Sequence, residues 1–310
     1  MPSLDVLIPF WGSPDLLMES IASVRAQTDP DWRLTVVDDC YPDQSVSGRV
    51  EALGDERITY LRNEHNLGPT GNYDRCVKLS DADVVVLMGC DDLMLPTYVA
   101  TVRRALTRFP DATIIQPGAE VVDEHGRVVR PLVDRAKRAL LTPKGSRPTE
   151  LRGEAGAVSL LRGDWLYWPA LAFRREVFGR VPFRPGFPII QDLAFVVDVI
   201  AAGGTLVYWP ELAFRYRRHS GSASAKTIQD GTRFEGEGRY YRLAARLMAR
   251  RGWRRAARVA RHHWISRGFA LSLLPGTLLH GYAQGARVLA RHALGLGPAR
   301  PHQPKGSQPQ

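Results

Sequence analysis

The chain has 310 residues, of which 44% are hydrophobic and 24% charged, so it can bury a substantial core and does not have a disordered composition. The N-terminal stretch MPSLDVLIPF carries an acid and a proline but no long apolar run, so we expect no signal peptide. The three cysteines are odd in number and lack metal-binding spacing. They favour a reduced, cytoplasmic setting.

The net charge of +10 is concentrated at one end of the chain. Glu237 is the last acidic residue, and thirteen arginines and Lys305 follow it. The preceding residues hold 28 basic against 32 acidic side chains, a net charge of −4. The basicity therefore belongs to the C-terminal segment and not to the chain as a whole.

Short apolar runs in the first 118 residues alternate with helical patterns. They predict strands at 4–10, 33–39, 57–63, 82–89 and 112–118. Strands that are apolar on both faces and separated by helices indicate an α/β fold with a mostly parallel central sheet flanked by helices. In such sheets, ligands bind beyond the carboxyl ends of the strands.

The next hundred residues have a less regular pattern. A hairpin is expected around His125 and Gly126, followed by a long polar loop over residues 134–153. Further elements are a helix from 153, a helix over 190–203 and two strands in TLVYWP and AFRYRRH. The last residues, 301–310, are expected to be disordered.

Acidic and amide residues cluster where the predicted strands end, in PFWGSPD, DDCYPDQS, RNEHNLGPTGN and GCDD. The adjacent Asp91 and Asp92 fit either the N-cap of a helix starting near Pro96 or a site that faces a cation. Asp38 and Asp39 fit either a turn or a ligand contact. Both alternatives stay open at this level.

The nature of the ligand can be narrowed by the motifs that are missing. No G-x-G-x-x-G follows the first strand and no G-x-x-x-x-G-K-[ST] occurs anywhere, which argues against a nicotinamide enzyme and a P-loop enzyme. Mg²⁺ or Mn²⁺ held by one or two carboxylates would neutralise a bound nucleotide diphosphate. The same cation would stabilise the negative charge that develops when this diphosphate leaves.

Four ordered segments, IPF, VVDDCYPDQS, RNEHNLGPTGNYDRC and LMGCDDLMLP, resemble the N-terminal half of family 2 glycosyltransferases, which have the Rossmann-like GT-A fold. Weaker similarity continues through IIQDLAF and YRRHSGSAS to about residue 225. The resemblance implies an inverting enzyme that transfers a sugar from a nucleotide-diphosphate donor, a UDP- or dTDP-sugar, to a hydroxyl acceptor. It also implies Mn²⁺ or Mg²⁺ as cofactor.

The same resemblance implies roles for residues at the strand ends. The nucleotide would be bound by Pro9, Phe10, Asp39, Asn66, Gly68, Asn72 and Asp91. Asp92 would bind the metal, together with Asp91. Where many relatives have Asp-x-Asp-Asp, this chain has Gly89 in the first position, so two of the three acids remain.

The family places its catalytic base in an acidic pair at the start of a later helix. Here the pair reads Gln191-Asp192, so Asp192 is the candidate general base that takes the proton of the acceptor hydroxyl. The alternative is an N-cap, because Asp192 precedes an apolar run.

The resemblance also implies roles for two further segments. In YRRHSGSAS, His219 would be a third metal ligand or a structural histidine, and phosphate would be contacted by Arg217, Arg218 or Ser220. In DWLYWPALAF, Trp165 and Trp168 would bind the acceptor or belong to the core.

The basic segment predicts two amphipathic helices in 234–268, broken near Gly252, and an apolar stretch over 269–279. That stretch is too short to cross a bilayer, and a basic helix with tryptophans fits the surface of an anionic membrane. Packing on the catalytic domain, an oligomer contact such as a homodimer, and nucleic acid are the alternatives. No nucleic-acid motif is present, and we expect no such partner.

The predicted organisation has four parts. Residues 1–118 form the nucleotide-sugar-binding half, 119–228 the acceptor-binding and catalytic half, 229–300 the basic helical extension and 301–310 the tail. Two other functions remain open: a nucleotidyltransferase, which would need a Gly-rich basic loop after the first strand, and a catalytically weak nucleotide-sugar-binding protein docked at a membrane.

Overall fold

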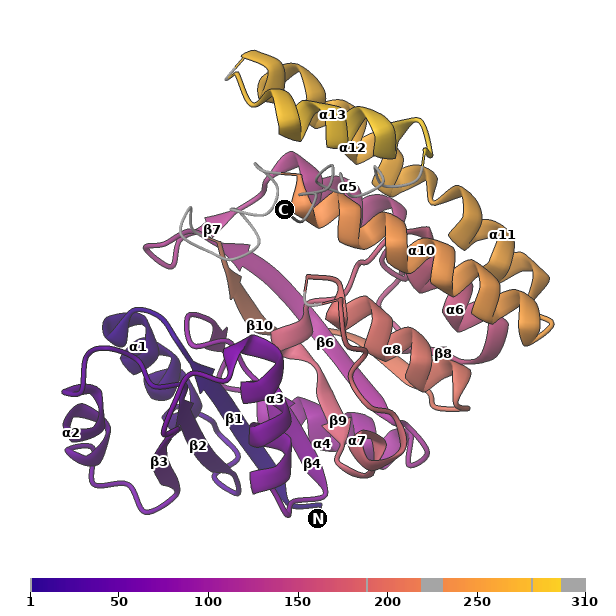
Figure 1. Cartoon of the computed structure of the whole chain (residues 1–310). Helices are drawn as coiled ribbons and strands as arrows, with labels where there is room; N and C mark the ends of the chain where they lie inside the picture. Colours follow the sequence, from indigo (N-terminus) through magenta and orange to yellow (C-terminus); the bar gives the residue numbers. More distant parts are fainter. Residues whose placement is uncertain (1, 188, 219–230, 280, 297–310) are drawn as a thin grey trace, which may run out of the picture. The chain divides into compact units, whose positions relative to one another are not determined.

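The computed structural model describes residues 2–187, 189–218, 231–279 and 281–296 (Figure 1). The chain divides into two compact units, residues 1–222 and 223–310. The first is built on a sheet and the second on helices. The predicted boundary at 228 lies outside the described residues, and the predicted division at 118 falls inside one strand of the first unit.

A single sheet forms the centre of the first unit, with strands in the order β3-β2-β1-β4-β9-β6-β10-β5 and with β7 and β8 paired to β6 and β10. The strands are β1 (Leu4–Phe10), β2 (Arg33–Asp38), β3 (Ile58–Arg62), β4 (Val84–Leu87), β5 (Leu93–Met94), β6 (Ile114–Val122), β7 (Val128–Val129), β8 (Thr149–Leu151), β9 (Ala172–Arg174) and β10 (Leu206–Arg217).

The pairing changes along this order. The neighbours β3, β2, β1 and β4 are all parallel, as predicted, so their carboxyl ends meet at one edge. β9 is antiparallel to both β4 and β6, and β10 is parallel to β6. The sheet is thus parallel in its first half and mixed in its second. Every residue of β4 is buried, as expected for an apolar strand covered on both faces.

Helices flank this sheet (Figure 1). They are α1 (Pro14–Arg25), α2 (Val46–Glu51), α3 (Gly68–Leu79), α4 (Tyr98–Arg108), α5 (Leu132–Leu140), α6 (Gly153–Arg162), the 3₁₀ turn η1 (Trp168–Ala170), α7 (Glu176–Arg180) and α8 (Gln191–Ala201). In α1, Pro14 occupies the first turn, and Leu17, Ile21 and Val24 bury one face at helical spacing.

Three sequence predictions need correction. The segment 134–153 is not a long loop, because it contains most of α5 and all of β8. The two strands predicted after 204 are one strand, β10, which passes through irregularities near Trp209 and Leu212. The helix that follows Asp91 and Asp92 begins at Tyr98 with Thr97 as its N-cap, so neither of these two acids caps it.

The second unit consists of α10 (Thr232–Arg250), α11 (Arg254–His262), α12 (Trp264–Leu279) and α13 (Ala283–Ala293). Gly252 takes a positive φ of 80° in the turn after α10, where the break was predicted. Inside, Ser266 Oγ donates to Glu237 Oε2 at 2.5 Å and lies 2.7 Å from His292 Nε2, joining three of the helices. Of the described helices in either unit, none is long and apolar enough to cross a membrane.

Candidate active site

Asp91 and Asp92 lie in a turn after β4, which we call the acidic turn (residues 89–92). Asp92 is 1% exposed, and its Oδ1 accepts a 2.8 Å hydrogen bond from the backbone N–H of Arg217. A Cβ on Gly89 would lie against Asp92 Oδ2 and 3.0 Å from Asp91 Oδ1. The two carboxylates therefore converge on the space that the missing side chain leaves open.

Electrostatics at the acidic turn favour a cation. Burial raises the pKa of Asp92 well above its usual value, and the negative charge of Asp91 raises it further. The hydrogen bond from Arg217 acts in the opposite direction. Converging carboxylate oxygens are the ligand type that Mg²⁺ and Mn²⁺ prefer. The residues present thus fit a divalent cation.

A complete ligand set is not assembled by the described residues. Among them, no group of three or more His, Cys, Asp or Glu side chains is placed to hold a metal. The predicted third ligand, His219, and the predicted phosphate ligand Ser220 both lie outside the described part of the chain.

Arg217 holds the acidic turn, and its position argues against the predicted phosphate contact. Its guanidinium donates to the carbonyl oxygen of Asp91 at 2.7 Å, to that of Glu124 at 2.8 Å and to Glu19 Oε2 at 2.5 Å. The side chain is 1% exposed, so a ligand cannot reach it without displacing these bonds. Its role is to fix the acidic turn to α1 and to the turn after β6. Arg218, by contrast, is exposed and pairs with Asp134.

A second polar network lies at the carboxyl ends of β2 and β3. Asp39 Oδ1 accepts from Asn63 Nδ2 at 2.7 Å and from the backbone N–H of Leu67 at 2.8 Å. Asn63 Nδ2 also donates to Asn72 Oδ1 at 3.1 Å, and Asn72 Nδ2 donates to Val37 O at 2.9 Å. Asp39 and Asn72 are therefore tied together, but Asn72 is 2% exposed and acts as a brace.

Asn63 was missed by sequence reasoning. It is 4% exposed, and its Oδ1 accepts no hydrogen bond from the described residues. A buried polar atom of this kind costs stability unless a ligand or water supplies a donor. The signal was present in RNEHN, where two asparagines follow a strand.

Other predicted nucleotide residues take different places. Pro9 is half-buried, while Phe10 is wholly buried against Tyr41 and contributes its carbonyl oxygen to Asp39 N–H at 3.1 Å. Asn66 is exposed, and its Oδ1 accepts from the backbone N–H of Gly68, which has a φ of 72°. Sequence reasoning overlooked Trp11, which is 52% exposed beside Tyr41 and offers an aromatic surface at this edge.

Asp192 lies in the first turn of α8, whose N-cap is Ile190. It is half-buried, and its Oδ1 accepts from the backbone N–H of Leu193 at 2.8 Å. Next to it, Gln191 Oε1 accepts from Thr70 Oγ1 of α3 at 2.6 Å. The start of α8 is therefore bonded to α3, which also carries Asn72 of the polar network around Asp39 (the Asp39 network).

The charges of Asp192 and Asp92 act on one common side chain, that of Tyr73. Burial raises the pKa of Tyr73 above its usual value, and the charges of both Asp92 and Asp192 contribute to the increase. Lys137, on α5, has its pKa lowered by burial, and the charge of Asp192 opposes this shift. Lys137 was assigned to a polar loop by sequence pattern and was therefore missed.

The two tryptophans predicted for the acceptor lie in the core. Trp165 is 1% exposed, donates to Ser159 Oγ at 3.2 Å and packs edge-on against Tyr208. Trp168 is 8% exposed within a cluster of aromatic rings that includes Phe195. Neither offers an open face to a sugar. The indole N–H of Trp168 finds no acceptor among the described residues.

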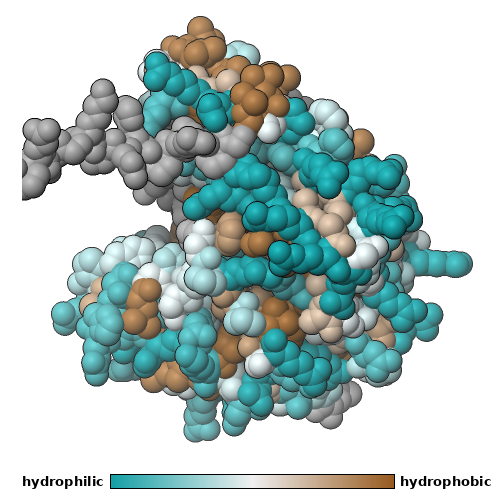
Figure 2. Space-filling model, turned by 45° about the vertical axis from the view of Figure 1, so that its right-hand side comes forward, coloured by the Kyte–Doolittle hydropathy of each residue, from teal (hydrophilic) through white to brown (hydrophobic). Residues whose placement is uncertain are grey.

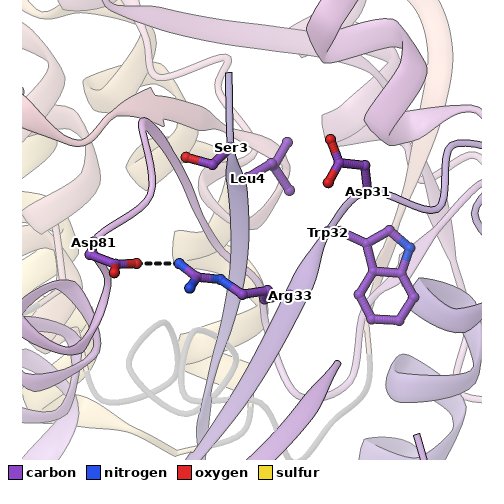
Figure 3. A pocket seen from close by; sticks show the side chains of 6 residues that line it. All are labelled: Ser3, Leu4, Asp31, Trp32, Arg33 and Asp81. Atoms are coloured by element: carbon purple, nitrogen blue, oxygen red, sulfur yellow. Dashed lines mark hydrogen bonds and ion pairs between the residues drawn. The ribbon is translucent and has the colours of Figure 1, made fainter. Parts of the chain in front are cut away.

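A surface hollow lies at the opposite, amino edge of the strands (Figure 3). It is lined by Ser3, Leu4, Asp31, Trp32, Arg33 and Asp81. Arg33, the first residue of β2, reaches across to Asp81 in an ion pair. Because ligands of such sheets bind at the carboxyl edge, this hollow is not the candidate site.

Solved structures, one of them named as a mannosyltransferase, share this architecture. TarS residues 1–349 from S. aureus, solved with UDP-GlcNAc, has a TM-score of 0.61 at 12% identity, covering 95% of this chain and 92% of that one. The mannosyltransferase PcManGT from Pyrobaculum calidifontis, solved with GDP-Man and Mn²⁺, has a TM-score of 0.59 at 13% identity, covering 95% and 85%. These similarities confirm the predicted GT-A fold.

Curated relatives are similar in sequence. The succinoglycan biosynthesis protein ExoW of Rhizobium meliloti is 27% identical over 218 residues, which are 67% of this chain and 66% of ExoW. A second relative, WcaA of Escherichia coli K12, carries the name of a colanic acid biosynthesis glycosyl transferase. It is 29% identical over 100 residues, which are 32% of this chain and 36% of WcaA. The chain therefore spans less than two thirds of the length of either relative.

The sequence profile described as glycosyl transferase family 2 matches residues 5–167, more than half of the chain. This range includes the Asp39 network and the acidic turn and ends before Asp192. The resemblance in the four strand-end segments is thus confirmed, and the chain belongs to glycosyl transferase family 2.

Proposed function

We propose that this glycosyltransferase transfers a sugar from a nucleotide-diphosphate donor, a UDP- or dTDP-sugar, to a hydroxyl acceptor with inversion, and that it requires Mn²⁺ or Mg²⁺. The observation that carries the proposal is the convergence of the Asp91 and Asp92 carboxylates beside Gly89 at the carboxyl edge of the sheet. Two carboxylates at that edge, of which that of Asp92 is buried, suit a cation and a diphosphate together.

The base of the nucleotide would bind at the Asp39 network. Asp39 uses Oδ1 for its bonds to Asn63 and Leu67, so Oδ2 is the oxygen that we assign to a base N–H. Asn63, whose own Oδ1 is buried, would hold Asp39 in position through its Nδ2. The exposed ring of Trp11 would cover the base from solvent.

Asp91 and Asp92 would hold the cation, which would supply charge neutralisation for the departing diphosphate. Arg217 would keep the acidic turn in one arrangement, since its bonds join that turn to Glu19 and to the carbonyl oxygen of Glu124. The third ligand proposed from the sequence, His219, and the phosphate contacts of Arg218 and Ser220 remain part of the proposal.

Asp192 would act as the general base. Its carboxylate would accept the proton of the acceptor hydroxyl while that oxygen bonds to the anomeric carbon and the bond from this carbon to the diphosphate breaks. Attack opposite the leaving group inverts the configuration. The relatives named for succinoglycan and colanic acid support a saccharide acceptor. We place the reaction in the cytoplasm, the setting that the cysteine content favours.

The first test is a thermal-shift screen with UDP, dTDP, GDP and ADP, each with and without Mn²⁺. A ligand that binds only the folded state raises the unfolding temperature. We expect a shift for UDP or dTDP that requires Mn²⁺ and is abolished by chelation. A shift for GDP alone would correct the donor, and no shift for any nucleotide would contradict the proposal.

Asp192→Asn should lower the transfer rate by about 10²- to 10⁴-fold, because the acceptor proton loses its base. The Mn²⁺-dependent nucleotide shift should persist. The matched control is Asp198→Asn on the same helix, whose carboxylate pairs with Arg184 at 2.5 Å and should affect stability instead. Loss of nucleotide binding together with transfer in Asp192→Asn would refute the base assignment.

The binding-protein alternative gives a different result in a donor assay. An enzyme should slowly hydrolyse its donor even without a hydroxyl acceptor, because water can bond to the anomeric carbon as the nucleotide diphosphate leaves. A binding protein should not. Metal-dependent release that Asp92→Asn abolishes would exclude the alternative for this chain.

A further inference from the structure

One face of α12 carries exposed apolar side chains at helical spacing, which we call the apolar stripe. Trp264, Leu271 and Leu278 follow one another seven residues apart and are 66%, 59% and 59% exposed, and Leu279 beside them is 87% exposed. Gly268 and Pro275, at the intervening turns, are also exposed. The stripe is therefore continuous over the helix and contains no charge.

Basic side chains border the apolar stripe, and the sequence contains no acidic residue after Glu237. The guanidinium of Arg267 lies 4.6 Å from the ring of Trp264, and the ring of His262 stacks on the same indole at 5.5 Å. The preceding helix α11 exposes Arg254, Arg255, Arg258 and Arg261. In Figure 2, hydrophobic side chains gather at the top of the view next to hydrophilic ones.

We propose that α11 and α12 form a docking surface for an anionic lipid bilayer, with the apolar stripe inserted at the level of the headgroups and the arginines paired with lipid phosphates. A continuous exposed apolar helix face is typical of an interaction site. An uncharged helix face beside a cluster of arginines is the composition of an interfacial helix, with tryptophan at the boundary.

Charge complementarity selects the lipid over a second copy of the chain. The helices α11 and α12 contain five arginines and no acid, so two such surfaces facing each other would bring like charges together. Nucleic acid would complement the arginines but would leave the leucines in water. An anionic bilayer satisfies both features at once.

The apolar part is tested by sedimenting the full chain with vesicles of equal parts phosphatidylglycerol and phosphatidylcholine, and with phosphatidylcholine alone. We expect binding to the anionic vesicles only. Leu271→Ser/Leu278→Ser should weaken it at least about ten-fold. The control Leu140→Ser/Leu212→Ser changes two leucines of the other unit that are 72% and 42% exposed and should leave binding unchanged.

The basic part is tested in the same assay. Arg254→Gln/Arg258→Gln should weaken binding about twenty-fold and reduce its dependence on salt, whereas Arg130→Gln/Arg135→Gln in the first unit should not. All four variants change exposed residues, so unchanged unfolding temperatures are expected and will show that folding is intact.

Four outcomes would overturn the proposal. Equal binding to both vesicles would remove the arginines from the interface, and binding that ignores the leucine substitutions would remove the apolar stripe. A dimer that Leu271→Ser/Leu278→Ser dissociates, without vesicle binding, would assign the surface to a second copy. Retention of duplex DNA without vesicle binding would assign it to nucleic acid. Each result is independent of sugar transfer.

Discussion

The two ends of the same parallel strands both hold buried carboxylates, and they hold them in different ways. At the amino edge, Asp5 accepts hydrogen bonds from Arg33 at 2.7 and 3.0 Å and from Ser80 Oγ at 2.6 Å. At the carboxyl edge, Asp92 accepts from a backbone N–H and lies beside the carboxylate of Asp91. One acid faces an opposite charge and the other a like charge.

This difference shows why burial of an acid does not by itself mark a site. Asp5 is 6% exposed and Asp92 is 1% exposed, so their burial is similar. What separates them is the source of the compensating charge. The fold supplies Arg33 directly to Asp5, whereas Arg217, whose charge lowers the pKa of Asp92, directs its guanidinium to carbonyl oxygens and to Glu19. The acidic turn is thus arranged for a charge that comes from outside the chain.

The largest effect that separates the edges is expected for Asp92→Asn. Loss of a metal-facing carboxylate should lower the transfer rate about 10³-fold and abolish the Mn²⁺ dependence of the nucleotide shift. Stability should not fall by more than about 1 kcal/mol, because the ionised carboxylate is desolvated and destabilised in the fold. Activity and chemical denaturation measure the two quantities. If Asp92→Asn were strongly destabilised but kept its transfer activity, Asp92 would have the structural role that we assign to Asp5.

At the amino edge, Asp5→Asn should act on stability and leave transfer unchanged. Removing one partner of a buried pair is costly, but Arg33 is 55% exposed and can return to water, so we expect a loss of about 2 kcal/mol in the free energy of unfolding. Asp81→Asn is the control, since that side chain is 84% exposed and should change stability by less than about 0.5 kcal/mol. A loss of transfer activity in folded Asp5→Asn would show that the amino edge takes part in function.

Much of this edge-to-edge arrangement could be predicted from sequence. Apolar runs set the first four strands, and parallel pairing then brings their polar ends together, so the positions of Asp39 and Asp92 followed from pattern alone. The resemblance to family 2 was carried by the same strand ends. Local periodicity and strand order are enough for this part of the site.

The rest depends on contacts between distant segments. Arg217 lies beside the acidic turn only because β10 pairs with β6 and β5, and no local signal distinguishes its carbonyl contacts from a phosphate contact. The burial of Trp165 depends on packing against Tyr208, since aromatic residues suit a core and a sugar site equally. The helix α5 was hidden by a polar sequence that resembles a loop.

The smallest effect concerns Gly89, where sequence and structure lead to opposite expectations. By the family pattern Gly89 is a missing acid, so Gly89→Asp should strengthen metal binding. In the structure a Cβ at this position meets both carboxylates, and Asp92 cannot move freely because its Oδ1 is bonded to Arg217. We therefore expect Gly89→Ala to weaken Mn²⁺-dependent nucleotide binding about ten-fold, or about 1.4 kcal/mol, and Gly89→Asp to weaken it further by adding a third negative charge.

Titration calorimetry with UDP and Mn²⁺ measures both, and Gly179→Ala, where a Cβ meets nothing within 4 Å, is the control. Tighter binding in Gly89→Asp would mean that the carboxyl edge can accommodate another acid and that its open space does not depend on glycine.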